Sequence, residues 1–101
     1  MPAYVIANVE VTDPEAYEEY RRHVPGTLEL YGGRFLVRGG EVEQLEGSWE
    51  PHRLVVLEFE SVEAARRWYG SPEYQAIIGL RQRTSNGDLV LVEGYDATAT
   101  R

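Results

Sequence analysis

The stretch RLVVLEFESVEAARRWYG, residues 53–70, decides the fold of this chain. Five of its first eight residues are apolar, and Val55, Val56 and Phe59 are residue types favoured in strands, so these eight residues are predicted to form a strand. Ser61 follows as a helix N-cap, and Val62, Ala65 and Trp68 then recur at helical spacing. Because the strand runs straight into this helix, its alternate residues should face the helix; these are Val55, Leu57 and Phe59.

Glycine, proline and helix-capping residues divide the rest of the chain into elements. Gly70 ends the helix, and Ser71-Pro72-Glu73 starts another that reaches about Thr84. Toward the N-terminus the sequence predicts a strand over 34–38 between two Gly-Gly pairs, a helix from Pro14 to about residue 31, and a first strand over 3–11. We expect Pro25-Gly26 to interrupt that first helix. An Asn86-Gly87 turn should lead into a last strand over 88–95, whereas residues 41–52 are polar and turn-rich.

The order of these elements is β-α-β-β-α-β, with a second helical piece before the final strand. Right-handed crossovers convert this order into one four-stranded antiparallel sheet with the helices on one face. The predicted fold class is therefore a ferredoxin-like α+β sandwich. At 101 residues the chain should form one domain, 1–101, with a flexible tail at about 96–101.

Composition excludes several classes of function. The net charge of −7 argues against binding to nucleic acid or to anionic membranes, since both need a basic surface. The chain has no cysteine, which excludes disulfides, thiolate catalysis and zinc sites built on Cys. The N-terminus reads as a first strand and not as a signal peptide, so we expect a cytoplasmic protein. All ten basic residues are Arg, which binds carboxylates through two parallel hydrogen bonds.

The helices should cover one face of the sheet only. We place on the covered face Val5, Ala7, Val9, Val55, Leu57, Phe59, Phe35, Val37, Val90 and Val92. The opposite face then carries charged and polar residues together with the apolar set Ile6, Leu36, Leu54, Val56, Leu89 and Leu91. This apolar set is too large for a face exposed to water, so we predict a symmetric homodimer through the uncovered face.

Four segments, in order, carry a family resemblance; they are YVIANVEVTDPEAYEEY, YGGRFLVRGG, VVLEFESVEAARRWYGSPEYQ and LVLVEG. Together they resemble the domain of unknown function 1330 family, of the dimeric α+β barrel superfamily. The resemblance implies a homodimer whose two sheets pack into a barrel-like sandwich, but no established reaction. Relatives in that superfamily include cofactor-independent monooxygenases, haem-degrading enzymes, muconolactone isomerases and stress-responsive proteins.

Candidate site residues surround the Gly-Ser-Pro break between the last two helices. Trp68 has the spacing of a core residue, and Tyr74 and Arg81 share one side of the following helix. We predict a cleft between the sheet and the broken helix; its lining residues should be Asn8, Arg38, Trp68, Tyr74 and Arg81. The two arginines would favour a small organic acid, and the rings would favour an aromatic one. Alternatively, Arg38 and Arg81 only pair with Glu58, Glu73 or other local carboxylates.

The resemblance also bears on cofactors. Asn8 and Trp68 resemble an Asn and Trp pair used by haem-degrading relatives, which also need a His ligand on the following helix. This chain has Tyr74 and Gln75 there. Its two histidines, His23 and His52, should both be exposed, which makes a poor metal site. We therefore expect no cofactor and no metal.

Three functions remain open at this point. The protein could bind a small organic molecule in each subunit. It could be a cofactor-independent oxygenase or isomerase that acts through Asn8, Arg38, Trp68 or Tyr74, with acid–base work by Glu58, Glu93 or His52 in the isomerase case. It could instead be a non-catalytic assembly or stress-response protein.

Overall fold

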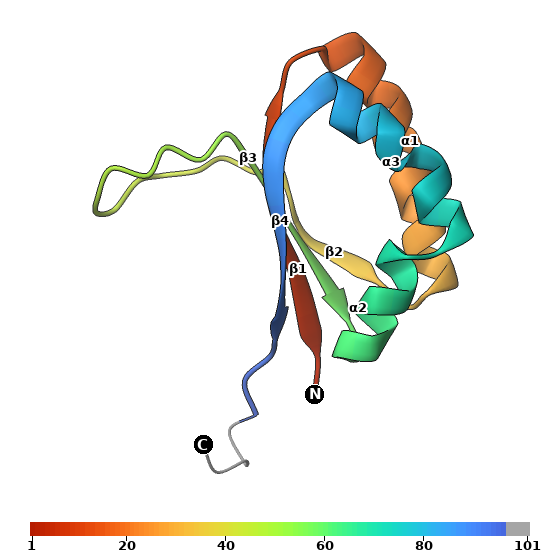
Figure 1. Ribbon diagram of the computed structural model, residues 1–101. Coiled ribbons are helices and arrows are strands. Elements are labelled where there is room, and N and C mark those ends of the chain that lie inside the picture. The colour runs from red at the N-terminus through yellow and green to blue at the C-terminus, as the bar shows by residue number, and fades with distance from the viewer. Residues whose placement is uncertain (97–101) are drawn as a thin grey trace.

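The computed structural model describes residues 1–96 and has two layers, a four-stranded antiparallel sheet and three helices that cover one of its faces (Figure 1). The elements are β1 (Ala3–Val11), α1 (Pro14–Leu30), β2 (Arg34–Arg38), β3 (Arg53–Phe59), α2 (Val62–Tyr69), α3 (Pro72–Thr84) and β4 (Ser85–Glu93). The strand order is β2-β3-β1-β4. The predicted ferredoxin-like α+β fold is confirmed, and all of the predicted tail except Asp96 lies outside the described residues.

The helices begin where their capping residues predict. Asp13 accepts a hydrogen bond from the Ala16 amide at 3.2 Å, and Ser61 accepts one from the Ala64 amide at 3.0 Å. Ser71 caps α3 in the same way, so the Gly-Ser-Pro break does separate two helices. In the part of the chain that the structure describes, no helix has the length and apolarity needed to cross a bilayer.

The core lies between the sheet and the helices. Trp68 is only 1% exposed, as its spacing predicts, and its ring packs against Phe59 and Tyr74. The indole N–H of Trp68 donates to the Thr27 hydroxyl at 3.0 Å, and this hydroxyl donates to the Val24 carbonyl. The largest core side chain therefore has its polar group satisfied by α1.

Helix α1 is continuous through Pro25, so the predicted interruption is wrong. Proline has no N–H, and the carbonyl of the residue four positions earlier loses its helical partner. That carbonyl belongs to Arg21, and it accepts a hydrogen bond from the Arg38 guanidinium at 2.9 Å. A side chain from β2 thus compensates for the bond that Pro25 removes.

The predicted faces of β4 are reversed. Leu89 lies opposite Ala7 and Leu91 opposite Val5, on the helix side, whereas Val90 and Val92 lie on the uncovered face. Both alternating sets of β4 are apolar, so alternation alone could not choose between them. The Asn86-Gly87 turn is also absent, because α3 runs directly into β4 and both residues pair with β1.

A β-bulge changes the faces of β2. Phe35 lies opposite Leu57, but Leu36 and Val37 together oppose the single residue Val56. The extra residue moves Val37 to the uncovered face and brings Arg38 opposite Val55, on the helix side. The prediction that Val37 faces the helices is therefore wrong, whereas Arg38 lies on the helix side, where the predicted cleft places it.

Residues 39–52, which we call the arm, leave the sheet on the side opposite the helices and project away from it (Figure 1). They form neither helix nor strand, and the arm's apolar residues are uncovered: Leu45 is 87% exposed and Trp49 is 60% exposed. The Asn8 side chain, on the uncovered face, accepts a hydrogen bond from the His52 amide at 3.0 Å. Asn8 thus anchors the base of the arm.

Candidate functional site

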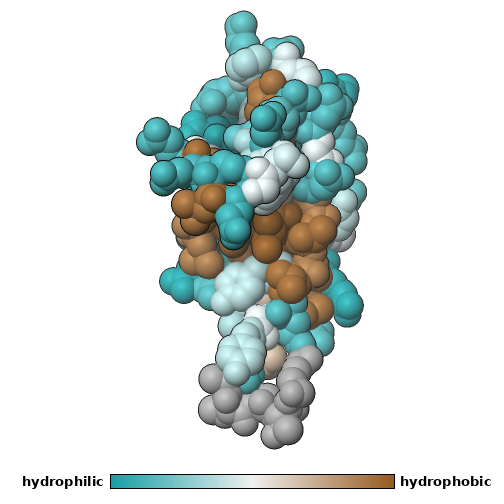
Figure 2. Space-filling view, turned by 90° about the vertical axis from the view of Figure 1, so that its left-hand side faces the viewer, coloured by the Kyte–Doolittle hydropathy of each residue, from teal (hydrophilic) through white to brown (hydrophobic). Residues whose placement is uncertain are grey.

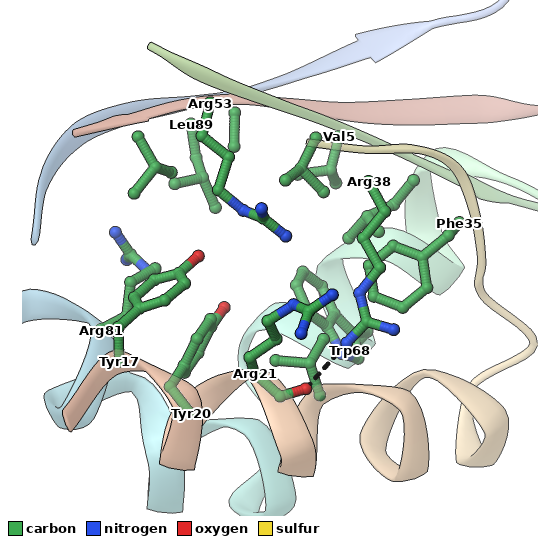
Figure 3. Close-up of a pocket in the computed structure, with 15 residues that line it drawn as sticks. Val5, Tyr17, Tyr20, Arg21, Phe35, Arg38, Arg53, Trp68, Arg81 and Leu89 are labelled. Carbon is green, nitrogen blue, oxygen red and sulfur yellow. Dashed lines mark hydrogen bonds between the residues drawn. The ribbon is translucent and has the colours of Figure 1, made fainter. Parts of the chain in front are cut away.

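A cavity lies between the inner face of the sheet and the helices (Figure 3). Its apolar walls come from alternate residues of all four strands, and four aromatic side chains line it: Tyr17, Tyr20, Phe35 and Trp68. Tyr17 and Tyr20 come from α1, and their hydroxyls point toward the sheet. The walls would therefore suit a flat apolar body with hydrogen-bonding groups at its edge.

Four arginines reach the same cavity from four different elements; they are Arg21 of α1, Arg38 of β2, Arg53 of β3 and Arg81 of α3. In Figure 3 the guanidinium groups of Arg21, Arg38 and Arg53 point into the space between sheet and helix, and Arg81 lies beside the tyrosines. None of the residues that line the cavity is Asp or Glu. Such a set of cations without a carboxylate is an electrostatic arrangement suited to an anion.

Local contacts hold these cations in place. The Arg38 guanidinium stacks over the Phe35 ring at 4.4 Å and is tethered by the Arg21 carbonyl. Arg53 lies 5.9 Å from the centre of the Tyr17 ring. Arg21 has one acidic neighbour, the exposed Glu18 at 3.3 Å, one turn earlier on α1. Ring contacts and a main-chain oxygen therefore position most of this charge.

The arginine cluster is electrostatically unfavourable by itself. Partial burial, followed by repulsion from Arg21 and Arg53, lowers the pKa of Arg38 below its ordinary value. The Nε atoms of Arg21, Arg53 and Arg81 are buried and have no hydrogen-bond partner among residues 1–96. Buried donors without partners are uncommon in folded proteins, and a bound anion would satisfy them.

Arg81 and two tyrosines form the other end of the cavity. Arg81 is only 8% exposed, and the Tyr20 and Tyr74 hydroxyls lie 2.9 Å apart beside it. Burial, helped by Tyr74, raises the pKa of Tyr20 far above its usual range, so its hydroxyl stays protonated. Burial alone would lower the pKa of Arg81, but the facing tyrosines raise it above its ordinary value. This end thus presents a permanent cation and a hydroxyl.

The cavity is narrow. Its volume is about 40 Å³, which is room for a few water molecules only. An aromatic ligand therefore fits only when the arginine side chains move, which their long unbranched stems allow.

The structure brings together most of the site residues that the sequence predicts. Arg38, Trp68 and Arg81 line the cavity, and Tyr74 lies directly behind Tyr20. Asn8 lies on the opposite face of the sheet. The alternative pairings are not found: Glu58 accepts from Arg34 at 2.6 Å, and Glu73 accepts from Tyr31 at 2.6 Å.

Sequence reasoning missed part of the lining, chiefly Arg21, Arg53, Tyr17 and Tyr20. Arg21 follows the buried Tyr17 by four positions and so shares its face of α1, a signal that the sequence does contain. Both histidines are exposed, as predicted. Among the described residues, no group of three or more Asp, Glu or His side chains is placed to hold a metal ion.

Comparisons with known proteins agree on the fold. The model of a family described as "Domain of unknown function (DUF1330)" matches residues 2–95. RPA0582 of Rhodopseudomonas palustris, a protein of unknown function, is similar in structure, with a TM-score of 0.76 and 20% identity over 94% of this chain and 83% of that one.

Two further structures are similar at a TM-score of 0.64, each covering 98% of both chains. One is SnoaB of Streptomyces nogalater, a cofactor-independent oxygenase, at 13% identity. The other is HapK of Hahella chejuensis, at 14% identity. No curated protein matches the chain significantly. At these identities the solved structures support the fold alone.

Proposed function

The chain belongs to the DUF1330 family, whose description names no activity, and we propose that it binds a small aromatic organic acid in the four-arginine cavity. The observation that carries this proposal is the convergence of four guanidinium groups on a space that no carboxylate lines. The chain as a whole has a net charge of −7, so this concentration of positive charge is local. A carboxylate would relieve the repulsion around Arg38 and accept hydrogen bonds from the unpartnered donors.

The lining favours binding over acid–base catalysis. No His, Asp or Glu lines the cavity, so the site lacks the usual side chains that remove a proton from carbon at neutral pH. Glu58, which the sequence offered as an acid or base, is on the other face of the sheet in an ion pair with Arg34. An isomerase mechanism therefore has less support than ligand binding.

A thermal-shift experiment tests the proposal with benzoate and salicylate as probes, and with the corresponding amides as neutral analogues. The acids should raise the melting temperature and the amides should not, at equal ionic strength. Arg38→Ala should abolish the rise, whereas Arg34→Ala, its neighbour on the opposite face of β2, should retain it. Equal shifts with the amides, or a rise that survives in Arg38→Ala, would refute an anion site.

We also propose that the protein is a homodimer through the uncovered sheet face. Figure 2 shows a band of apolar side chains across this face. Residues of this band include Ile6, Val37, Leu54, Val56, Val90 and Val92. Val90 is 56% exposed in the isolated chain, and a continuous apolar patch of this kind is typical of an interface.

Light scattering tests the homodimer. Val90→Arg introduces a charge into the patch and should give a folded monomer, as checked by circular dichroism. Glu63→Arg introduces the same charge on the exposed side of α2 and should leave the dimer intact. Leu91, which the sequence placed on the uncovered face, is unsuitable for this test because it lies on the helix side. A monomeric wild-type protein at micromolar concentration would refute the proposal.

A further inference from the structure

The arm projects from the sheet and packs against neither the helices nor the inner face of its own subunit (Figure 1). It carries the exposed residues Leu45 and Trp49, and Asn8 holds its base on the uncovered face. We propose that the arm of each subunit docks on the second subunit, against the end of α3 and the start of β4, beside Arg81. This inference rests on the homodimer proposed above.

The arm is long enough to pass a facing sheet. Residues 39–52 run out and back, with roughly seven residues in each direction, and an extended chain advances about 3.3 Å per residue. The reach is then on the order of 20 Å, whereas two packed sheets lie about 10 Å apart. In a face-to-face dimer the tip must therefore lie beside an edge of the second sheet, level with its helices.

Strand register decides which end of the sheet the arm adjoins. Arg53, where the arm returns to β3, lies opposite Val9, and Val9 lies opposite Gly87 near the start of β4. The arm and the start of β4 are thus at the same end of the strands. They are at opposite edges, since the order is β2-β3-β1-β4.

A twofold axis can pack the two faces in two simple ways. An axis parallel to the strands places β2 of one subunit opposite β4 of the other and keeps the strand ends aligned. The arm then meets the start of β4 and the end of α3. An axis across the strands places β2 opposite β2 with the ends reversed, and the arm meets the end of α1 and the end of β3.

Charge distinguishes these two arrangements. The arm carries four glutamates, all exposed; they are Glu41, Glu43, Glu46 and Glu50. The end of α3 carries Arg81 and Arg83 in its last turn. The end of α1 has no basic residue in its last turn and carries Glu29, and Glu60 follows β3. Arg34 at the start of β2 is at this end too, but it is already in an ion pair with Glu58. Complementary charge therefore favours the axis parallel to the strands.

The docking surface also connects with the cavity. An open groove runs along the start of β4, and its lining includes Arg81, Gln82, Asn86, Asp88 and Leu89. Arg81 and Leu89 line the four-arginine cavity as well. A docked arm would thus cover the Arg81 end of the cavity, so the second subunit would complete the ligand site of the first.

Cysteine cross-linking tests the arm directly, because the chain has no cysteine of its own. Glu46→Cys near the tip is combined with Asn86→Cys at the start of β4, or with Glu60→Cys after β3 as the matched control. Each double variant and each single variant is treated with a short bismaleimide, and denaturing gels report covalent dimers. Light scattering on the same samples reports the mass before cross-linking.

We expect most chains of the Glu46→Cys/Asn86→Cys variant to become covalent dimers, several-fold more than in either single variant. The Glu60→Cys pairing should give no more than the single variants. If the protein is dimeric and the Asn86 pairing fails, or the Glu60 pairing is stronger, the docking proposal is wrong although the homodimer stands. If the protein is monomeric, the homodimer itself fails, whatever thermal shifts show for ligand binding.

Discussion

Replacing Arg53 with methionine should stabilise the ligand-free protein. The Nε atom of Arg53 is buried without a partner, and removing such a donor recovers about 1–3 kcal/mol. The substitution loses the contact between the guanidinium and the Tyr17 ring, which contributes about 0.5–1 kcal/mol. Methionine keeps an unbranched apolar stem, so the net effect should be a gain of about 1 kcal/mol in the free energy of unfolding.

Urea unfolding monitored by circular dichroism, at one fixed protein concentration, measures this gain. For a domain of this size about 1 kcal/mol corresponds to a rise of roughly 4–8 °C in the melting temperature. Arg66→Met, an exposed arginine on α2, should change stability by less than about 0.5 kcal/mol. The stabilised Arg53→Met protein should also respond less to benzoate. A loss of 1 kcal/mol or more would refute the reasoning, because Arg53 would then be a structural residue.

Three further substitutions test particular contacts. Thr27→Val leaves the buried indole N–H of Trp68 without its acceptor and should lower the free energy of unfolding, measured in urea, by about 1–3 kcal/mol. The same substitution should cost much less in a protein that already carries Trp68→Phe, because that protein has no indole N–H. The hydrogen bond from Tyr31 lowers the pKa of Glu73 from its ordinary 4.5. The stabilisation of the fold by this bond is therefore complete above pH 4.5, and it disappears as the pH falls through the lower pKa that Glu73 has in the folded protein. Tyr31→Phe should therefore be less stable than wild type at neutral pH and equal to it in strong acid, and a difference that persists in acid would contradict this. Gly87→Ala places a Cβ against the backbone of β1 and should destabilise the fold by about 2 kcal/mol, whereas an unchanged urea midpoint would show that the strands separate easily.

The fold could be predicted from local signals in the sequence. The capping residues Ser61 and Ser71 start helices where the sequence predicts, and the helical spacing of Trp68 correctly indicates a core residue. These signals depend on a few neighbouring residues only. For that reason they can be interpreted without knowledge of the tertiary structure.

The candidate site was only partly predictable, because its geometry depends on register. Nothing local distinguishes the two apolar faces of β4, and nothing local reveals the bulge in β2. The hydrogen bond from Arg38 to the Arg21 carbonyl forms only because α1 and β2 are adjacent in the folded chain. Pro25 alone indicates that this carbonyl lacks a helical partner, but not which residue will bind it. Tyr20 and Arg53 join the site for the same reason, since only the packed layers bring them together.

The bulge at Leu36 and Val37 links the two proposed surfaces through a single position in the chain. Deleting Leu36 would restore regular alternation with Val37 still opposite Val56 and Arg38 still opposite Val55, so both side chains would keep their faces. Closing the bulge without a deletion, by a one-residue slip of Val37 and Arg38 along β3, would instead turn Val37 inward and move Arg38 from the cavity to the apolar face. When homologous sequences are aligned, a one-residue gap at this point should therefore coincide with a retained arginine at position 38.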